Sequence, residues 1–548
     1  MTAFAKTRRA GHRSRPPLLL LLAALVVGFG TCLPALYLLI RAFDVEAAQL
    51  AGIVFRPRNL WLLGNTLALV AVVLAIGTAI ALPMAWLVTR SDLRARGLVT
   101  FLMTMPLAVP GYVMAYALLG LSGYYGFARV WLGISLPPLH GLWGAGLALA
   151  LYTFPYIFLG LRAALRGMDP GLEETARSLG RSRGQVFRQV VLPQLWPALM
   201  SSWLIVGLYV IGDFGAIALM RYEVFSYAIY TQYAGAFDRS YAAWLSLMLL
   251  ALTVLALWAQ SRLSRNRRFA RLGPGVARQH HPLRLGLWAW PAWGAVALVV
   301  FASLGLPLLV LAHWMRRGVE AMDWAMLGQA ALNSGLSASV VAVLTVALAL
   351  PLVILSLRWP GRLPALAERL AWLGYATPPL AFGLAMVFFT LALVPFLYQT
   401  HAVLIFAWVM TFLALALGPL RMGLMQAGTR PEEAARSLGR GPVTAFRLVT
   451  LPRLRGPVIA AALLVFIAVV KELPLTWMLG PTGWRSLSTT VFARTVEGMM
   501  AEAAPFALVI ILFSALFVGL ILKYEGQGRR SPPAPGKPDP SRTEQPLP

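Results

Sequence analysis

The stretch EETARSLGRSRGQVFRQVVLP, from Glu173 to Pro193, returns almost unchanged as EEAARSLGRGPVTAFRLVTLP, from Glu432 to Pro452. The two copies align without a gap at a constant offset of 259 residues. Similarity at a fixed spacing indicates a duplicated structural unit. The chain is therefore expected to contain two copies of one unit.

The match continues on both sides of this segment. Upstream, Asn65-Thr66 and Pro83 correspond to Asn333-Ser334 and Pro351 at an offset of 268 residues, so about nine residues of loop differ between the copies. Downstream, Asp213 falls opposite Glu472, again at the offset of 259. The whole unit is therefore duplicated, and not the one loop alone.

Composition places both units in a membrane. The 548 residues are 59% hydrophobic and 12% charged, with a mean hydropathy of +0.72, which excludes a water-soluble globular protein. A spanning helix needs about 20 mostly apolar residues. Twelve stretches qualify, which predicts an all-α polytopic protein of two six-helix units: 18–40, 61–89, 98–121, 141–165, 195–220, 241–260, 286–314, 333–357, 370–396, 401–425, 457–480 and 503–522.

The net charge of +27 follows this topology. With the N-terminus in the cytoplasm, the segments that alternate onto that side hold 36 of the 47 Lys and Arg residues: 1–17, 90–97, 162–188, 261–284, 358–369, 421–455 and 523–548. The positive-inside rule then puts both termini in the cytoplasm, with the spans in contact with lipid. A nucleic-acid-binding surface is rejected because it would leave the apolar runs unexplained.

The basic N-terminus resembles the start of a signal peptide, but no small-residue cleavage site follows the apolar run, so that run is expected to remain as the first span. The lone Cys32 excludes an internal disulfide. The predicted segments are a basic N-terminus 1–17, a first transmembrane domain 18–260, a basic linker 261–285, a second transmembrane domain 286–522 and a disordered tail 523–548.

Because each unit has six spans, the two matching loops must emerge on the same face of the membrane. The repeat is therefore parallel, its pseudo-two-fold axis runs along the membrane normal, and the translocation path is expected where the halves meet. Each loop has acidic residues at the start of a short amphipathic helix, which glycine then ends. A charged helix-turn-helix of this kind on the cytoplasmic face is expected to dock a partner.

The spacing E-x-A-x-x-x-G, nine residues, then an aliphatic residue, any residue and Leu-Pro resembles the EAA loop of permeases of ATP-binding-cassette importers. Thr175 replaces the middle alanine in the first copy. In that family the loop is a coupling helix that sits in a cleft of the ATPase subunit. The resemblance implies this role for Glu173, Glu174, Ala176, Gly180, Val190, Leu192 and Pro193, and for Glu432, Glu433, Ala434, Ala435, Gly439, Val449, Leu451 and Pro452.

No phosphate-binding G-x-x-x-x-G-K-[ST] loop occurs in the sequence, since the only Gly-Lys pair is Gly536-Lys537. The chain is thus expected to be a transport permease and not an enzyme. It is expected to bind no cofactor itself, while ATP and magnesium bind separate cytoplasmic ATPase subunits, two copies for two loops. The resemblance also implies a periplasmic solute-binding protein as a partner and a place in the inner membrane of a bacterial cell.

Two fused permease copies of about this total length resemble three groups of importers, which are the ferric-iron, thiamine and phosphonate-type systems. Two stretches are similar to segments of ferric-iron permeases: Gly212-Asp213-Phe214-Gly215-Ala216 and, above all, Lys471-Glu472-Leu473-Pro474. Thiamine and phosphonate-type solutes remain the alternatives within the same class.

Asp213, Lys471 and Glu472 are the candidate residues of the translocation path. A carboxylate inside a span costs about 2.5 to 3.5 kcal/mol, so it should face a cavity or a partner. One hypothesis is an acidic ring that suits a hard cation. The other places both acids at helix ends, with Glu472 paired to Lys471 or Arg485. A metal site remains unidentified, because His140, His313 and His401 lack a partner at the i, i+4 spacing.

The third and ninth spans are predicted to kink at their prolines, Pro106, Pro110, Pro378 and Pro379.

Two other classes of membrane protein are alternatives to the importer. An ion-coupled secondary transporter also uses repeats and buried acids, but it has no paired docking loops. A membrane-embedded transferase would need acids or histidines clustered at one interface, whereas the largest acidic pairs here lie inside the repeated loop.

Overall fold

The structure is a computed structural model and describes residues 16–44, 47–235, 238–265, 283–318, 320 and 322–527. Most of the predicted basic N-terminus, most of the linker 261–285 and nearly all of the tail 523–548 lie outside the described residues. Those predictions therefore stay predictions.

The predicted all-α membrane fold is confirmed. Among the described residues, nine helices are long and apolar enough to cross a membrane, and the count rises to twelve if three bent helix pairs are each one span. The nine continuous spans are α1 (Leu18–Phe43), α3 (Pro57–Arg90), α7 (Gly141–Gly167), α10 (Leu192–Gly212), α13 (Arg239–Arg265), α14 (Ala289–Val300) continuing into α15 (Leu306–Gly318), α16 (Trp324–Arg358), α19 (His401–Ala427) and α26 (Met500–Gln527). The three bent pairs are α4 (Arg96–Thr104) with α5 (Gly111–Leu119), α17 (Arg362–Ala376) with α18 (Pro379–Leu393), and Pro442–Arg453 with α23 (Arg455–Lys471).

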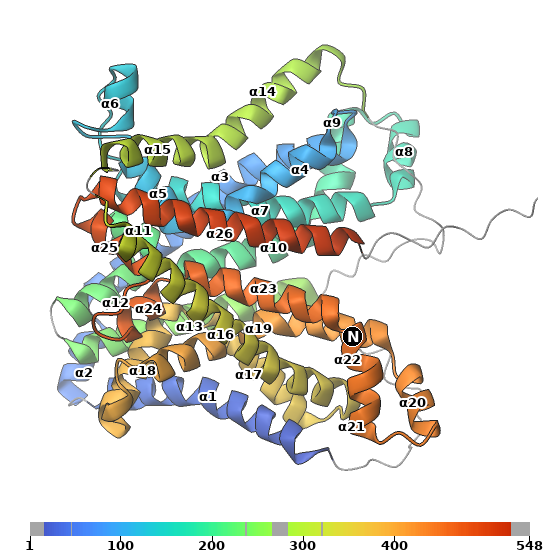
Figure 1. Ribbon diagram of the computed structural model, residues 1–548. Helices are drawn as coiled ribbons and strands as arrows, with labels where there is room; N and C mark the ends of the chain where they lie inside the picture. Colours follow the sequence, from blue (N-terminus) through green and yellow to red (C-terminus); the bar gives the residue numbers. More distant parts are fainter. Residues whose placement is uncertain are drawn as a thin grey trace, which may run out of the picture.

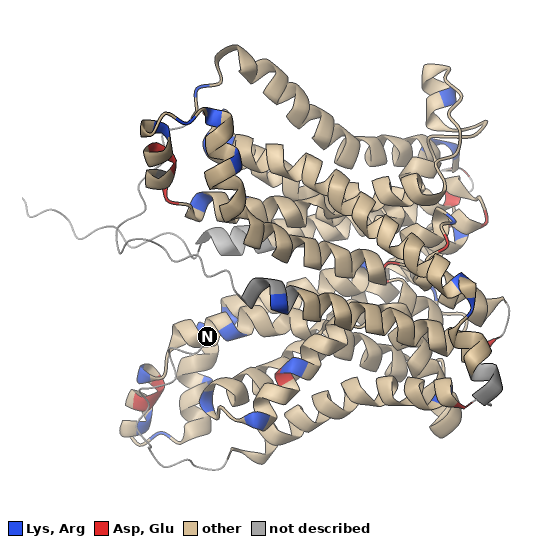
Figure 2. Ribbon diagram, turned by 180° about the vertical axis from the view of Figure 1, so that it is seen from behind, with Lys and Arg blue, Asp and Glu red and all other residues tan. Residues whose placement is uncertain are grey.

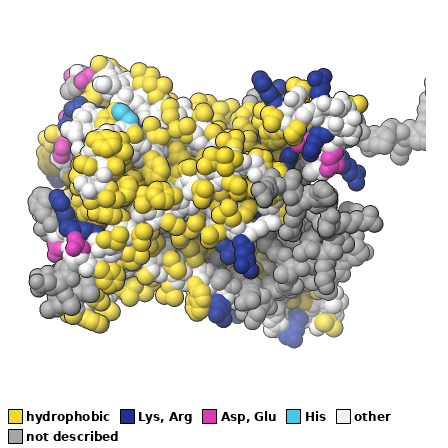
Figure 3. Space-filling model, turned by 90° about the horizontal axis from the view of Figure 1, so that it is seen from below, with side chains coloured by type: hydrophobic (Ala, Val, Ile, Leu, Met, Phe, Trp, Pro, Cys, Tyr) yellow, Lys and Arg dark blue, Asp and Glu magenta, His cyan; other side chains and the backbone are white. Residues whose placement is uncertain are grey.

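Apolar side chains cover the middle of the molecule in a broad band (Figure 3). Charged residues gather toward the two ends of the helices, and few interrupt the tan helices between them (Figure 2). Because lipid cannot hydrogen-bond to an exposed backbone, helices that satisfy their own amides fit this environment.

The third and ninth spans are sharply bent. The segment Arg96–Ala108 meets α5 at 87°, and α17 meets α18 at 104°. The bends fall at Pro110 and Pro378, which are 268 residues apart, and proline disfavours a helical residue before it. The predicted kinks are confirmed in both copies.

The fifth and eleventh spans are shorter than the predicted 195–220 and 457–480. Helix α10 ends at Gly212 and α23 ends at Lys471, and the next residue, Asp213 or Glu472, is extended with ψ of 138° or 133°. Two short helices follow, α11 (Gly215–Leu219) and α24 (Pro474–Leu479). The apolar run continues through each break, which is why the sequence pattern did not show it.

The first span of each repeat lies on the other repeat. Helix α1 packs against α16, α17 and α18 as well as against α13 of its own half, while α14 and α15 pack against α3, α4 and α5, and α15 also packs against α26 of its own half. Figure 1 shows α1 alongside α17 and α18, and α14 and α15 beside α4 and α5. The two halves are therefore clasped by exchanged helices.

The Asn65-Thr66 and Asn333-Ser334 pairs make equivalent hydrogen bonds in the two halves. The Asn65 and Asn333 side chains donate to the carbonyls of Glu223 and Arg485, both at 2.9 Å. Thr66 and Ser334 accept from the amides of Phe225 and Leu487, which begin α12 (Phe225–Ala234) and α25 (Leu487–Val496). These bonds, of which those to Thr66 and Ser334 are buried, fix the second span of each half to the helix that precedes its last span.

Candidate coupling loops and translocation path

The two repeated loops form matching helix pairs. The first is α8 (Pro170–Ser178) followed by α9 (Arg183–Val186), and the second is α20 (Arg430–Ser437) followed by α21 (Pro442–Ala445). Between the helices, Gly180 and Gly439 have φ of 79° and 84°, a conformation that favours glycine. Both loops lie at the same end of the molecule, as a parallel repeat requires (Figure 1).

The two acids of each loop point in different directions. Glu173 and Glu432 are buried, whereas Glu174 and Glu433 are exposed. Arg90 Nη2 lies 2.8 Å from Glu173 Oε1, and Arg358 Nη2 lies 2.6 Å from Glu432 Oε2. The arginines end α3 and α16, where a cation suits the helix C-terminus. Each loop is thus ion-paired to the second span of its own half.

Glu432 makes the more extensive network. Both Arg358 guanidinium nitrogens donate to it, at 2.9 and 2.6 Å, and the Thr450 hydroxyl donates at 2.8 Å. Burial opposes ionisation of this carboxyl, but the Arg358 and Thr450 hydrogen bonds outweigh it and lower the pKa of Glu432. The stability from these bonds is therefore present above the unfolded pKa and is lost as pH falls through the folded pKa.

The outer face of each loop is uncovered. Leu179 and Leu438, at equivalent positions before the glycines, are 77% and 84% exposed. Ala176 and Ala435 are half-buried. Leu192-Pro193 and Leu451-Pro452 start the helices that return to the membrane, α10 and α22 (Leu451–Arg453). An exposed leucine beside an exposed glutamate, twice on one face, is a surface that a partner can cover.

The second candidate site is the break after α10 and α23. Asp213 Oδ1 accepts from the amides of Ala216 and Ile217, at 3.1 and 3.4 Å. Glu472 accepts from the amides of Leu475 and Thr476, from the Thr476 hydroxyl and from Trp408 Nε1, at 2.6 to 3.0 Å. Both carboxylates thus cap the short helices that follow them, which matches the helix-end hypothesis.

The pairing predicted for Glu472 differs from what the structure shows. Lys471 Nζ donates instead to the Leu107 carbonyl at 2.8 Å and lies 5.8 Å from the centroid of the Tyr152 ring. The Arg485 guanidinium contacts Met326 Sδ at 3.0 Å. The cause is local: the amides and hydroxyl that follow Glu472 are nearer donors than either cation, and they occupy its oxygens.

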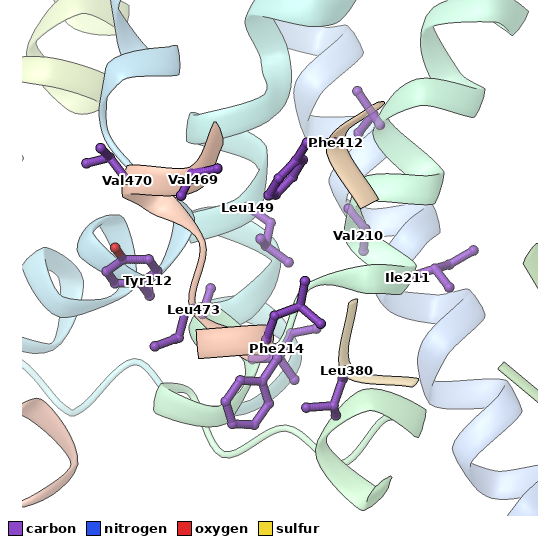
Figure 4. Close-up of a cluster of buried hydrophobic side chains, with 14 of the residues drawn as sticks. Tyr112, Leu149, Val210, Ile211, Phe214, Leu380, Phe412, Val469, Val470 and Leu473 are labelled. Carbon is purple, nitrogen blue, oxygen red and sulfur yellow. The ribbon is translucent and has the colours of Figure 1, made fainter. Parts of the chain in front are cut away.

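Side chains of both halves interlock beside these breaks. Figure 4 shows Phe214 and Leu473 packed together with Tyr112 from α5. A Cβ added at Gly215 would lie 2.8 Å from Leu473 Cδ2 and 2.9 Å from Tyr112 Cβ. The Phe214 ring also packs on Phe492 of α25, with centroids 5.3 Å apart. We call this cluster of Tyr112, Phe214, Leu473 and Phe492 the crossing point, because side chains of both halves pack together there, next to the two carboxylates.

Comparison with known proteins decides between the classes. The family model for the binding-protein-dependent transport system inner membrane component matches residues 71–269 and 344–524, one match in each repeat. The chain belongs to this family.

Relatives of this permease include the Fe(3+)-transport system permease protein FbpB 2 of Haemophilus influenzae, which is 33% identical over 93% of this chain and 99% of its own length. The ferric transport system permease protein FbpB of Actinobacillus pleuropneumoniae is 23% identical over 82% of this chain and 69% of its own. The sulfate transport system permease protein CysT of Escherichia coli K12 is 29% identical over 42% of this chain.

The histidines of the permease have other partners. His313 Nδ1 accepts from Trp131 Nε1 at 3.0 Å, its Nε2 donates to the Tyr125 carbonyl at 2.9 Å, and His401 stacks edge-on against Trp484. Across the described residues, no group of three or more His, Cys, Asp or Glu side chains could hold a metal ion.

Sequence reasoning missed two features of the permease. Arg90 and Arg358 have the offset of 268 that relates Asn65 to Asn333, so the repeat itself could have identified them. The tyrosines near Asp213 could not be found in this way, because Tyr152 and Tyr209 correspond to Thr411 and Ala468 in the second copy. Only the packing of the two halves brings them together.

Proposed function

We propose that this permease imports ferric iron, delivered by a periplasmic binding protein and driven by ATP that separate cytoplasmic subunits hydrolyse. The observation that carries the ATPase part is the pair of matching loops with exposed Glu174 and Glu433 at one end of the molecule. The ferric part rests on the names of the relatives, together with the Lys471-Glu472-Leu473-Pro474 stretch.

In each loop one acid is buried and the other is exposed, which supports a specific path by which movement of the ATPase reaches the membrane helices. An ATPase that grips Glu174 and Leu179 moves α8, and the buried ion pair carries this displacement through Glu173 to Arg90 at the end of α3. The second loop repeats the connection through Glu432 and Arg358. Two loops favour two ATPase copies, and ATP with magnesium belongs on those subunits.

The expected orientation follows from charge. The loops and both termini face the cytoplasm, where the positive-inside rule places the basic segments. Closure of the ATPase pair then draws the loop ends together, and the halves open toward the docked binding protein. ATP hydrolysis returns them to the inward-facing state.

The test removes the coupling surface and follows both binding and transport. A Glu174→Arg, Glu433→Arg double variant is expected to lose its ATPase subunits on co-purification, and cells that depend on it lose ferric-iron uptake. Glu320→Arg, an exposed acid outside the loops, is the matched control and should behave like wild type. Full retention of the ATPase by the double variant would contradict the coupling role. Normal iron uptake by a deletion strain would contradict the cargo.

A further inference from the structure

The interface of the two halves holds one cation with no carboxylate partner. Lys471, half-buried at the end of α23, donates to the Leu107 carbonyl of the first half and faces the Tyr152 ring. Among the ion pairs of the described residues, none includes Lys471. A charge at membrane depth is costly unless a counter-charge or a functional role compensates it.

The Tyr152 ring that this ammonium group faces belongs to a cluster of phenols. The Tyr152 and Tyr209 ring centroids are 5.0 Å apart, and the Tyr209 hydroxyl faces the Asp213 carboxylate. Tyr156 interacts with Tyr152 from the same helix, and Tyr375 approaches Tyr156 from the second half. Tyr156, Tyr209 and Asp213 are half-buried and Tyr375 is 44% exposed, so part of this group can be reached from outside the protein.

The carboxylate oxygens of the nearby acids already accept hydrogen bonds from the protein. Glu472 is 6% exposed and accepts four hydrogen bonds, so a metal ion would have to displace them to reach its oxygens. Asp213 accepts two backbone amides on Oδ1 and faces Tyr209. These bonds do not support an acidic ring that would coordinate a bare cation.

The Tyr112 hydroxyl lacks a hydrogen-bond partner in the described part of the chain. Tyr112 is 4% exposed, and its ring packs at the crossing point. A buried hydroxyl without a partner is costly, and a ligand that accepts from it would remove this cost. The groups at the interface with hydrogens left to donate are thus the Tyr112 hydroxyl and the Lys471 ammonium, which donates one of its three hydrogens to Leu107.

We propose that this interface, formed by Lys471, Tyr112, Tyr152 and Tyr209, is a cargo site that binds oxyanions, and that ferric iron crosses it still wrapped in an anionic oxygen chelator. The ferric part of this inference rests on the proposed function. Carboxylate or phosphate oxygens of the chelator accept from Lys471 and Tyr112, while the metal keeps its hard oxygen ligands. No protein atom needs to enter the coordination sphere of the iron.

The test measures what the purified full chain retains in lipid nanodiscs. Ferric citrate labelled in both iron and citrate should bind with the two labels in a constant ratio. Lys471→Met should weaken retention of both labels about tenfold, and Lys471→Arg should restore most of it because the donor charge remains. Arg362→Gln, which removes an exposed charge at the start of α17, is the matched control and should change neither label.

Three outcomes would overturn the site. The first is iron retained without citrate, the second is retention that Lys471→Met leaves unchanged, and the third is a visible phenolate-to-iron charge-transfer band that disappears in Tyr209→Phe. Parallel binding of labelled sulfate and phosphate separates the two proposals. Lys471-dependent retention of these anions without any retention of ferric citrate would leave the oxyanion site standing and reject the ferric cargo. Absence of all retention by the wild-type chain would reject the site.

Discussion

At the scale of single residues, adjacent identical side chains in the coupling loops have opposite roles. Glu173 and Glu432 face inward to an arginine of the same half, whereas Glu174 and Glu433 remain exposed. The sequence showed two acids and predicted one docking role for both. Which acid turns inward depends on where the end of the second span lies, and that position is set by tertiary packing.

The Arg90 and Glu173 pair offers the sharper test, since their side chains are only 3% and 8% exposed. Arg90→Met leaves Glu173 as a buried charge that has lost its closest partner and is expected to cost about 3 kcal/mol of stability. This should appear as a clear drop in melting temperature in detergent, with loss of transport. The double variant Arg90→Met, Glu173→Gln removes both charges and should regain much of the melting temperature. A single variant as stable as wild type would contradict a structural role for the pair.

At the scale of helices and their ends, the sequence predicted the spans well and their interruptions unevenly. Bends at Pro110 and Pro378 were predicted because proline has a fixed effect on the backbone. The breaks at Asp213 and Glu472 were missed, because short apolar helices after them continue the hydrophobic pattern. The carboxylates are the local signal that both breaks share, since each caps the next helix through its side chain.

Gly215 tests the packing of these short helices. An added Cβ would lie under 3 Å from Leu473 and Tyr112, so Gly215→Ala should force the halves apart at the crossing point and cost about 1 to 3 kcal/mol. We expect a lower melting temperature and ATP hydrolysis less dependent on the binding protein. Gly207→Ala in α10 is the matched control, because its Cβ would meet only Val70 at an ordinary 3.7 Å. Equal behaviour of the two variants would contradict the close-packing argument.

At the scale of the whole molecule, two six-helix units and their parallel arrangement could be predicted from one repeated loop and an even number of spans. The differences between the two halves could not be predicted from the sequence. The second half bends by 69° where Pro442–Arg453 meets α23, whereas Arg183–Gly212 runs as one apolar helical segment in the first. The exchange of first spans also left no trace in the hydrophobic pattern, which reports burial and not the identity of the partner.

Labelling can test the orientation of both loops in one experiment. Cys32 is the only cysteine of the chain, so Cys32→Ser gives a cysteine-free background. Ser178→Cys and Ser437→Cys, exposed at equivalent positions, should both react only with a reagent that reaches the cytoplasmic side. Thr482→Cys, exposed beyond α24, should react only from outside the cell. Reaction of the two loop cysteines from opposite sides would refute the parallel repeat and the coupling model with it.

The clasp formed by α1 and by α14 with α15 bears on how such a chain arose. A solitary unit would cover its leading helix only in part, through its own last span, and a second copy of the same unit would cover the rest. Pairing of two separate copies therefore offers a route to the fused chain. Once joined, each copy can change separately, and the replacement of Tyr152 by Thr411 and of Asp213 by Glu472 shows such divergence where the two halves meet.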